Sequence, residues 1–527
     1  MDEIPVPWLP VAFSGQLTAF GALLSVLWVF LGISAWMTRQ QSAKFSPPLV
    51  FNRVSKIISR RIHAWAYLLN GPTIIQRGFE KSHGELFEVL APDARMVFVS
   101  SPKYIKELDD APDNALSLNA AAKHMLQPLY TMNGFNWFDR RGTEGVGFVR
   151  TLRTLLTNNL PQLLPDLTVL TRTRFAELRS QRSVVINGAA HSPIYPMMMD
   201  IVVLLNAYSL FGKDLASNEQ WKASALAYVE ETLLNAEVVK LMPKFLAPLV
   251  GGVLSRRLNA HKSFFQSLTP VAEERCRERD REMLGHAVPK HSDCISWIIA
   301  TAPRQKPWSA ERVIYELMAI WFGSVHILST TIVFVIHDLC LHPEYVEPLR
   351  NEIEAQYAEF ERTGRGLLLL DSFIKESSRL SPVESMSVRR CALQPFALSD
   401  GTKLEVGDWA CAPSGAINCS AEHYPEPLKF NGFRFADPSV FPDERSSVSQ
   451  QPKPSKLTDV DNSFLMWGTG RMACPGRYYA SAFMKVVVAQ IIINYDLALV
   501  EPDAPRWVTW RAARLPKAAT MVTFIPR

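Results

Sequence analysis

The sequence predicts a mainly α-helical domain with small β-sheets, preceded by a single amino-terminal transmembrane helix. Three observations support this fold class. Residues 17–37 form an almost uninterrupted apolar run close to the amino terminus. Residues 148–210 and 220–290 repeat apolar positions at three- and four-residue spacing, which is typical of helices. Shorter segments at 86–89 and 96–100 are rich in strand-forming residues and predict a β-hairpin.

The amino-terminal apolar run is long enough to cross a membrane. No charged residue lies between Glu3 and Arg39, and about twenty apolar residues span a bilayer core of about 30 Å. A cleavable signal peptide is the alternative, but it would begin with basic residues and have a shorter apolar core. The basic residues that follow the run place most of the chain in the cytosol (Arg39, Lys44, Arg53, Lys56, Arg60 and Arg61). The sequence therefore predicts an anchor at 1–38, a linker and the start of the domain at 39–76, and the main domain at 77–527.

Composition and cysteine spacing exclude several classes of protein. The 527 residues are 48% hydrophobic and 20% charged, as in folded proteins with a large core. The net charge of +5 is small and no basic run with interleaved aromatic residues occurs, so we expect no nucleic-acid partner. The seven cysteines show no paired spacing, which argues against a zinc site or a disulfide framework.

One cysteine, Cys474, stands in a segment that can present its sulfur to a metal. Gly468 and Gly470 precede it, Gly476 follows it, and an apolar helix is expected from about Tyr478. Glycines let the backbone fold closely around the sulfur. The start of a helix has unpaired N–H groups and the positive end of the helix dipole, which lower the pKa of a cysteine.

Two alternatives fit the same segment. A cysteine beside glycines is commonly an inert buried thiol. Gly468-Thr-Gly470 could instead begin a dinucleotide-binding loop, but Ala473 stands where a third glycine is needed and no βαβ unit precedes it. We set the dinucleotide alternative aside on these grounds.

The segment from Trp467 to Gly476 resembles the haem-binding loop of the cytochrome P450 superfamily, F-x-x-G-x-[RH]-x-C-x-G. Trp467 replaces the leading phenylalanine, while Met472 departs from the Arg or His that contacts a haem propionate in relatives. The resemblance implies a haem b cofactor (iron protoporphyrin IX) with the Cys474 thiolate as its axial ligand. The other residues that it places at the cofactor in this loop are Trp467, Gly468, Gly470, Arg471 and Gly476.

A second motif combines a carboxylate and two arginines. Glu376 and Arg379 are three residues apart and share a helix face. An ordinary surface pair, which contributes little, is the alternative. Arg434 follows in an aromatic setting about forty residues before Cys474. The set resembles the ExxR helix and the later meander arginine of cytochromes P450, which implies a buried three-membered charge network that holds the haem-side loop.

A long apolar helix is expected from 313 to about 341, with Ser309 as its N-cap and Pro343 after its end. It resembles the I-helix of the superfamily, whose motif [AG]-G-x-[DE]-T-[TS] falls on residues 323–328. His326 replaces the acid, and an Ile-Leu pair replaces the hydroxyl pair that relays protons during oxygen activation. Proton delivery must then use another group, and the candidates are His326, Ser329, Thr330, ordered water or a hydroxyl of the substrate. A purely structural histidine is the alternative for His326.

Two further arginines are expected at the haem propionates through the resemblance. Arg153 stands in a segment similar to the C-helix, although an arginine on an amphipathic helix is usually only a solvated side chain. Arg389 stands in a predicted strand that follows the ExxR motif. The same resemblance implies that 383–388 line the substrate pocket. It implies that 242–250, which has two prolines, is a lid over the substrate channel, unless it is a plain interhelical loop.

Together these motifs resemble a cytochrome P450 monooxygenase over 77–527. The resemblance implies oxidation of a hydrophobic small molecule, with electrons from NADPH through NADPH-cytochrome P450 reductase at the side of Arg471 and Arg477. It also implies a single-pass anchor in the endoplasmic reticulum membrane with a cytosolic catalytic domain. The sequence looks most like filamentous-fungal members, among which tailoring of terpenoids, indole alkaloids and polyketides is common. The alternatives are a haem-dependent dehydration, rearrangement or peroxide-driven oxidation, and a non-catalytic membrane haem-binding protein.

Overall fold

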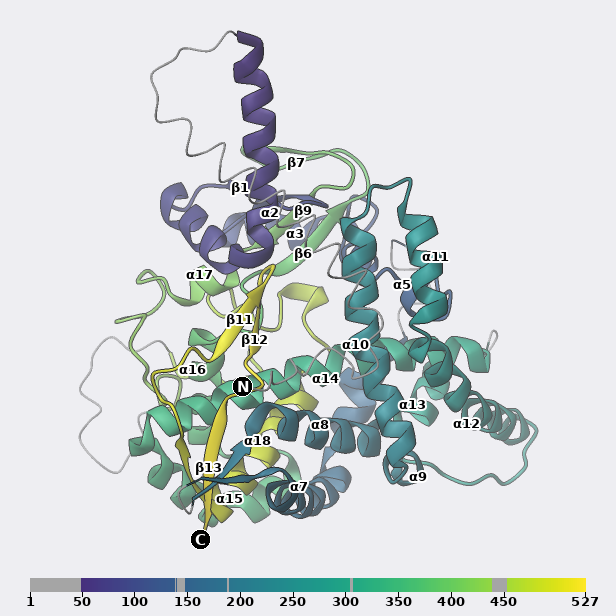
Figure 1. Ribbon diagram of the computed structural model, residues 1–527. Helices are drawn as coiled ribbons and strands as arrows, with labels where there is room; N and C mark the ends of the chain where they lie inside the picture. The colour runs from purple at the N-terminus through teal and green to yellow at the C-terminus, as the bar shows by residue number, and fades with distance from the viewer. Residues whose placement is uncertain (1–48, 138, 140–146, 187–188, 304–306, 438–452) are drawn as a thin grey trace.

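The computed structural model describes residues 49–137, 139, 147–186, 189–303, 307–437 and 453–527. The predicted anchor at 17–37 lies outside these residues. Within them, helices dominate and β-strands form small sheets, as predicted (Figure 1). One part of the domain holds the larger sheet beneath α2, and most helices pack in the other part (Figure 1).

The helices follow one another along most of the chain. The α-helices are α2 (Leu49–Ser82), α3 (Pro102–Asp110), α4 (Leu118–Leu126), α5 (Pro128–Thr131), α6 (Gly147–Arg150), α7 (Leu160–Arg182), α8 (Ile194–Phe211), α9 (Lys213–Ala216), α10 (Glu219–Leu241), α11 (Ala247–Arg257), α12 (Ala260–Met283), α13 (Cys294–Thr301), α14 (Ala310–Leu341), α15 (Val346–Thr363), α16 (Leu368–Leu380), α17 (Ser414–Asn418) and α18 (Arg477–Asn494). Short helical turns of other types are η2 (Thr151–Leu156), η3 (Pro343–Tyr345) and η5 (Gly470–Met472).

The strands form two larger sheets and two hairpins. The five-stranded sheet has the order β1 (Phe87–Leu90), β2 (Arg95–Phe98), β9 (Trp409–Ala412), β6 (Ser387–Ala392) and β3 (Leu116–Ser117). The four-stranded sheet has the order β10 (Tyr495–Leu499), β13 (Met521–Pro526), β5 (Ala189–Pro193) and β4 (Val184–Ile186). The hairpins are β7 (Phe396–Ala397) with β8 (Lys403–Leu404), and β11 (Trp507–Trp510) with β12 (Ala513–Pro516). Only the β2–β9 pair is parallel among these described strands.

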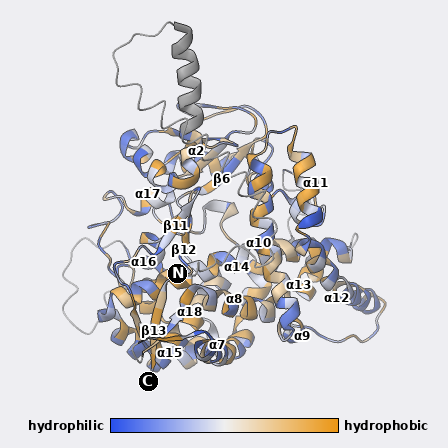
Figure 2. Cartoon of the chain, in the orientation of Figure 1, coloured by the Kyte–Doolittle hydropathy of each residue, from blue (hydrophilic) through white to orange (hydrophobic). Residues whose placement is uncertain are grey.

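Helix α14 is the centre of the hydrophobic core. Its first turn is capped by Ser309, whose hydroxyl accepts a hydrogen bond from the Arg312 N–H (3.3 Å), as the sequence predicts. The helix packs against α8, α10, α12, α16 and α18, and hydrophobic residues are concentrated in this region (Figure 2). Among the described helices, α8 and α14 are long and apolar enough to span a membrane, but 72% and 67% of their apolar windows are buried inside the domain. Both are therefore core helices.

Several local predictions are confirmed. The hairpin at 86–100 forms, with Phe87 opposite Phe98, and a helix begins at Pro102 behind the capping Ser101. The segment 148–210 is largely helical, as predicted, and β4 and β5 interrupt it. Strand β5 pairs with β13, more than 300 residues later in the chain, and such a partner leaves no local pattern. The proline-containing segment 242–250 is a short break followed by α11.

The tip of the β11–β12 hairpin carries an arginine where the backbone favours glycine. Trp510 pairs with Ala513, so Arg511 and Ala512 form a two-residue turn, and Arg511 has a φ of 52°. Hairpin turns of this length commonly use glycine or asparagine at positive φ, since other side chains are strained there. The Arg511 N–H donates to the Leu68 carbonyl (2.7 Å), which ties the turn to α2.

The side chain of Arg511 explains its presence in this strained turn. Its guanidinium donates to Asp93 Oδ1 and to Glu237 Oε2, both at 2.8 Å. These three side chains, which we call the Arg511 clasp, connect the β1–β2 turn, α10 and the carboxyl-terminal hairpin. Burial raises the pKa of Asp93, but the charge and hydrogen bond of Arg511 outweigh it, so the pKa lies below its usual value.

We predict that Arg511→Ala destabilises the domain by about 3 kcal/mol, because the buried Asp93 loses its arginine partner and Glu237 keeps only Lys240. Urea unfolding monitored by circular dichroism measures the loss. The exposed pair Arg277–Glu274 gives a matched control, since solvent screens it and Arg277→Ala should leave stability almost unchanged. Equal effects of the two substitutions would contradict the prediction.

The same clasp predicts a pH dependence with a definite sign. A carboxylate whose folded pKa is lowered adds stability above its unfolded pKa, about 3.9 for aspartate, and that stability disappears as the pH falls further. The difference between wild type and Arg511→Ala should therefore be full at pH 7 and shrink below pH 4.

Candidate functional site

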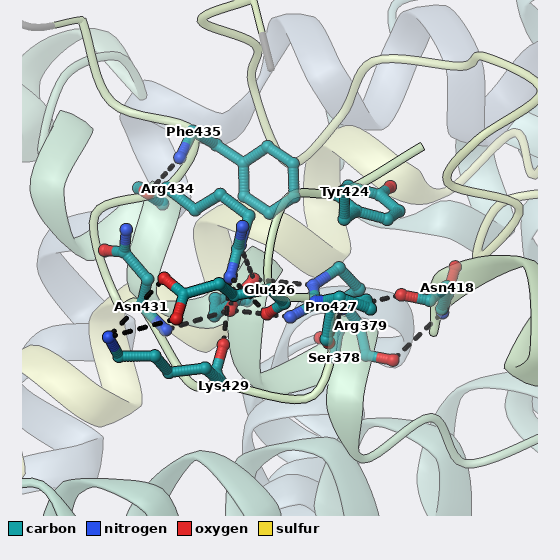
Figure 3. A network of polar contacts seen from close by, with 12 residues as sticks. Ser378, Arg379, Asn418, Tyr424, Glu426, Pro427, Lys429, Asn431, Arg434 and Phe435 are labelled. Carbon is teal, nitrogen blue, oxygen red and sulfur yellow. Dashed lines mark hydrogen bonds and ion pairs between the residues drawn. The ribbon is translucent and has the colours of Figure 1, made fainter. Parts of the chain in front are cut away.

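Glu376 and Arg379 of α16 form the centre of a buried polar network. One helical turn separates them, and the Arg379 guanidinium donates to both carboxylate oxygens of Glu376, at 2.7 and 2.8 Å. Both side chains are completely buried. Arg379 also donates to the Asn418 and Pro427 carbonyls, both at 2.6 Å, in the arrangement seen in Figure 3. The predicted pair is therefore not a surface ion pair.

Arg434 completes the network from a distant part of the chain. Its Nε donates to Glu376 at 3.1 Å, and its Nη atoms donate to the Pro425 and Lys429 carbonyls at 2.8 and 2.9 Å (Figure 3). The Asn431 N–H adds a further bond to the same carboxylate at 2.9 Å. Two arginines face one glutamate, so backbone carbonyls supply the remaining acceptors that the buried positive charge requires.

The same face of α16 holds the chain that leads to the cysteine. Asp371 accepts a hydrogen bond from the Leu457 N–H (2.6 Å), and Lys375 donates to the Ser455 hydroxyl (2.8 Å) and the Lys456 carbonyl (3.0 Å). The Leu457 carbonyl in turn accepts from the indole N–H of Trp467 (2.6 Å). An unbroken series of polar contacts therefore runs from α16 to the residue that begins the cysteine loop.

The loop around Cys474 is closed by its own backbone. The Cys474 N–H donates to the Trp467 carbonyl (2.7 Å), and Gly468 and Gly470 adopt positive φ values of 72° and 55°. A Cβ at Gly470 would lie 2.8 Å from Asp109 Oδ2. Both this contact and the positive φ therefore favour glycine at this position. Gly476 is different, because a Cβ there would meet Leu152 at an ordinary 3.7 Å. Cys474 is half-buried and lies three residues before the first residue of α18.

The pKa of Cys474 differs from the expected direction. Burial raises the pKa of the thiol above its usual value, and this outweighs the lowering by the N–H groups of Gly476 and Arg477 and by the Arg477 charge. The sequence-based prediction that the helix start lowers the pKa of the Cys474 thiol is therefore wrong for the protein without a bound metal. A bound metal cation would reverse the balance, because coordination deprotonates a thiol outright.

An open face of α14 lies in the same helical part of the domain. Gly323 and Ile327 are one turn apart on one side of this otherwise buried helix. A Cβ at Gly323 would meet no atom within 4 Å, and Ile327 is 47% exposed. Helices α14 and α18 pack against each other. The cysteine loop and the open, apolar face thus belong to one region of the fold.

Two buried polar atoms near these elements support a haem at this place. Arg389 pairs with Glu384 and donates to the Met386 carbonyl (3.3 Å), but its Nε has no hydrogen-bond partner among the described residues. The Thr469 hydroxyl, inside the cysteine loop, is also unpartnered within the described chain. Buried donors normally have partners, and the carboxylates of a haem would supply acceptors. A single thiolate ligand, an open apolar face and free donors together fit the cofactor.

Two other arginines that were predicted to contact the cofactor have more exposed side chains, Arg153 and Arg471. Arg153 lies on the turn η2 with an exposed side chain, and its contact with a propionate stays a prediction. Arg471 is half-exposed and donates to Asp113 and to the Ala111 carbonyl, at 3.0 and 2.9 Å.

The three predicted proton-relay residues occupy different environments. The hydroxyl of Ser329 is buried and donates to the Val325 carbonyl of its own helix (2.9 Å). His326 and Thr330 lie one turn apart, and His326 Nδ1 is 3.3 Å from the hydroxyl of Tyr195 on α8. Nothing near Tyr195 in the sequence marks His326 as its partner, so this contact could not be expected from the sequence.

We predict that Arg434→Ala yields protein that fails to retain haem, because Glu376 and the Pro425 and Lys429 carbonyls lose a buried donor, at about 1–3 kcal/mol for each unsatisfied group. The ratio of haem to protein absorbance after purification measures retention. Arg362→Ala, which removes an exposed pair with Glu359, is the control and should bind haem normally. Normal haem content in Arg434→Ala would count against the role of the network.

Comparison with known proteins agrees with this geometry. A family model described as Cytochrome P450 matches residues 70–511. Cytochrome P450 monooxygenase olcJ of Penicillium canescens is 26% identical over 489 residues, which cover 89% of this chain and 87% of that protein. Cytochrome P450 monooxygenase paxP of Penicillium paxilli is 27% identical and covers 81% of this chain and 80% of that protein. Cytochrome P450 monooxygenase 151 of Postia placenta is 28% identical, with 86% and 88% covered.

The fold is also similar to a solved structure. The structure of a retinoic-acid-bound cyanobacterial CYP120A1 superposes with a TM-score of 0.61 at 17% identity and covers 88% of this chain and 97% of that one. At this identity the likeness concerns the fold alone. The family match extends over most of the chain, and the similar fungal proteins are named monooxygenases. The chain therefore belongs to the cytochrome P450 family and is a P450 monooxygenase.

Proposed function

We propose that this monooxygenase hydroxylates or otherwise oxidises a hydrophobic small molecule in fungal secondary metabolism, with a terpenoid, an indole alkaloid or a polyketide as the substrate. The observation that carries the proposal is the cysteine loop, in which the Cys474 N–H donates to the Trp467 carbonyl (2.7 Å) and the side chain is half-buried. The substrate class rests on similarity to fungal monooxygenases of Penicillium and Postia placenta.

The chain's own residues would hold haem b as follows. Cys474 would supply a thiolate ligand to the haem iron, and the N–H groups of Gly476 and Arg477 would stabilise its charge. The unpartnered donors of Arg389 and Thr469 would bind the propionates. When bound, the haem supplies reductive activation of dioxygen, which an axial thiolate favours by donating electron density.

The residues of α14 would shape the pocket. Gly323 leaves room, and the exposed Ile327 offers an apolar surface to a hydrophobic substrate. Ile327 can neither donate nor accept a proton. Ser329 has its hydroxyl engaged by the helix backbone, so His326 and Thr330 are the protein groups left for proton delivery on this helix.

The electron donor and the membrane belong to the same proposal. NADPH-cytochrome P450 reductase would deliver electrons on the side of Arg471 and Arg477, and the Arg477 guanidinium already donates to the Cys474 carbonyl (3.0 Å). Residues 17–37 would anchor the protein in the endoplasmic reticulum membrane, with 77–527 as the cytosolic haem domain. Phe245 and Leu249, which are 80% and 67% exposed around the start of α11, support contact of the expected lid region with lipid or with an apolar substrate.

A second candidate function is a dehydration, rearrangement or peroxide-driven oxidation in the same pocket. Ile327 favours this candidate, because the exposed face of α14 carries no hydroxyl at that position. A membrane haem-binding role without turnover is a further alternative that the same experiment tests.

Oxygen labelling tests the proposed function. The chain is expressed with a fungal reductase, supplied with NADPH, candidate terpenoid, indole and polyketide intermediates and ¹⁸O-labelled dioxygen, and the products are analysed by mass spectrometry. We expect one ¹⁸O atom per oxidation. Cys474→Ser is the control and should lose both turnover and the strongly red-shifted Soret band of the reduced carbon monoxide complex.

The outcomes of this experiment separate the candidates. Product without ¹⁸O would favour a non-monooxygenase reaction. Absence of substrate-dependent NADPH consumption with every intermediate would favour binding without turnover. A wild-type Soret band that lacks the red shift would contradict the thiolate ligand itself.

We predict that Ile327→Thr keeps or improves the ratio of product formed to NADPH consumed, because a threonine hydroxyl adds a proton-transfer group to the open face. Product yield and NADPH consumption measured together give this ratio. Ile327→Val, which keeps the branched apolar shape, is the control and should leave the ratio unchanged. Loss of product in a folded, haem-loaded Ile327→Thr would show that the apolar side chain is itself required.

A further inference from the structure

A buried polar contact joins α8 to the flank of the open face on α14. Tyr195 lies in the first turn of α8, and its hydroxyl is 3.3 Å from Nδ1 of His326. The two helices pack along each other in the core. Apolar side chains surround the contact on both helices, including Ile194 and Val325, which are completely buried. The hydrogen bond offsets the cost of burying the two polar atoms, and removal of either partner would leave the other without it.

The position of His326 places the pair beside the expected pocket. On a helix, residues three or four apart lie on neighbouring rows, so His326 and Thr330 flank the row of Gly323 and Ile327. His326 Nε2 is buried and has no hydrogen-bond partner among the residues that the structure describes, and the buried Thr330 hydroxyl lies beside the Tyr195 hydroxyl. Buried polar atoms without partners are rare in folded proteins and mark sites where another group must bind or pass.

The charge states of the pair favour one arrangement of protons. Burial lowers the pKa of His326 to about 4, so the ring is neutral at pH 7 and has one donor and one acceptor nitrogen. Burial raises the pKa of Tyr195 to about 12, against a lowering by the nearby Thr330, so its hydroxyl keeps its proton. The tyrosine can then donate to Nδ1, which leaves the ring proton on Nε2.

We propose that Tyr195 is a positioning residue that fixes His326 with its proton on Nε2, and that the two side chains together deliver protons to the pocket in place of the threonine that Ile327 replaces. This inference rests on the proposed monooxygenase function. It adds Tyr195 of α8 as a positioning residue and assigns Nε2 of His326 as the proton donor.

The proposed transfer conserves protons at every step. The Nε2 proton leaves to an acceptor oxygen in the pocket, while the hydroxyl proton of Tyr195 moves to Nδ1. A proton from solvent then binds Nε2 as the Nδ1 proton returns to the Tyr195 phenolate, so each cycle consumes one solvent proton and restores the starting arrangement. The ring never holds two protons, as a pKa of about 4 requires at neutral pH.

Glu230 of α10 is the acid whose charge acts on Tyr195. Burial, together with the charge of the neighbouring Glu231, raises the pKa of Glu230 to about 7. A change in its protonation near neutral pH therefore alters the electrostatic field at the Tyr195 hydroxyl.

Substitution of Tyr195 tests the proposal. Tyr195→Phe keeps the ring and removes only the hydroxyl. We expect product per NADPH to fall roughly a hundredfold, the usual size of a proton-transfer contribution, while the KM for substrate stays unchanged. His326→Gln should show the same loss, and the double variant should lose no more than either single one, because the two residues act as a unit.

A matched control lies on the same helix. Tyr208 of α8 bonds to Asp166 at the surface, so Tyr208→Phe should keep wild-type coupling. Reduced carbon monoxide spectra report whether each variant is folded and loaded with haem. A Tyr195→Phe variant that couples as well as wild type, or that changes only the KM, would overturn the proposal.

A measurement independent of turnover separates this inference from the proposed function. Nitrogen NMR of ¹⁵N-histidine-labelled wild type in the reduced carbon monoxide complex, with the His326 signal assigned through His326→Gln, reports the position of the ring proton. We expect the proton on Nε2 in wild type and a mixture of tautomers in Tyr195→Phe. A proton on Nδ1 in wild type would overturn the positioning role, whether or not any substrate is turned over.

Discussion

The carboxylate of Glu376 binds two buried guanidinium groups, and the path of the chain to the cysteine depends on that interaction. Arg379 approaches from the same helix and Arg434 from a segment 58 residues later. Two positive charges against one negative charge would be unfavourable in a core, but backbone carbonyls accept the remaining N–H groups. The segment that supplies these carbonyls is thereby fixed on α16. Asp371 and Lys375 on the same helix bind the segment that contains Ser455 and Leu457. One face of α16 therefore positions the chain that leads into the cysteine loop.

The cysteine loop combines a buried thiol with backbone N–H groups that can stabilise a thiolate. Burial raises the pKa of Cys474, although the helix start presents N–H groups toward it. The side chain therefore favours the neutral thiol until a metal supplies positive charge, and then the same N–H groups stabilise the thiolate. The open face of α14 extends this logic to the other side of the pocket. Its apolar residues leave space and contribute no charge, so the polar chemistry there falls to His326 and its neighbours.

Much of this organisation could be predicted from local sequence, and what could not has a common physical origin. Ser309 at a helix start and the glycines around Cys474 have local causes, and the structure shows both as expected. Partners that come from far along the chain leave no local pattern, as for β5 with β13 and for Tyr195 with His326. The pKa of Cys474 was predicted in the wrong direction because burial depends on the whole fold. The family resemblance supplied Glu376 with its two arginines, which pattern alone could not have distinguished from a surface pair.

The pairing of β13 with β5 has a consequence for how the protein is made. The strand ends one residue before the carboxyl terminus, yet its partner precedes the core helix α8. While the nascent chain emerges from the ribosome, the edge of β5 that pairs with β13 stays unpaired during the synthesis of more than 300 residues. The edge of β2 that pairs with β9 stays unpaired for a similar length of chain. Chaperones must shield these edges, and a premature stop codon that removed only the last dozen residues would leave the sheet beside α8 permanently incomplete.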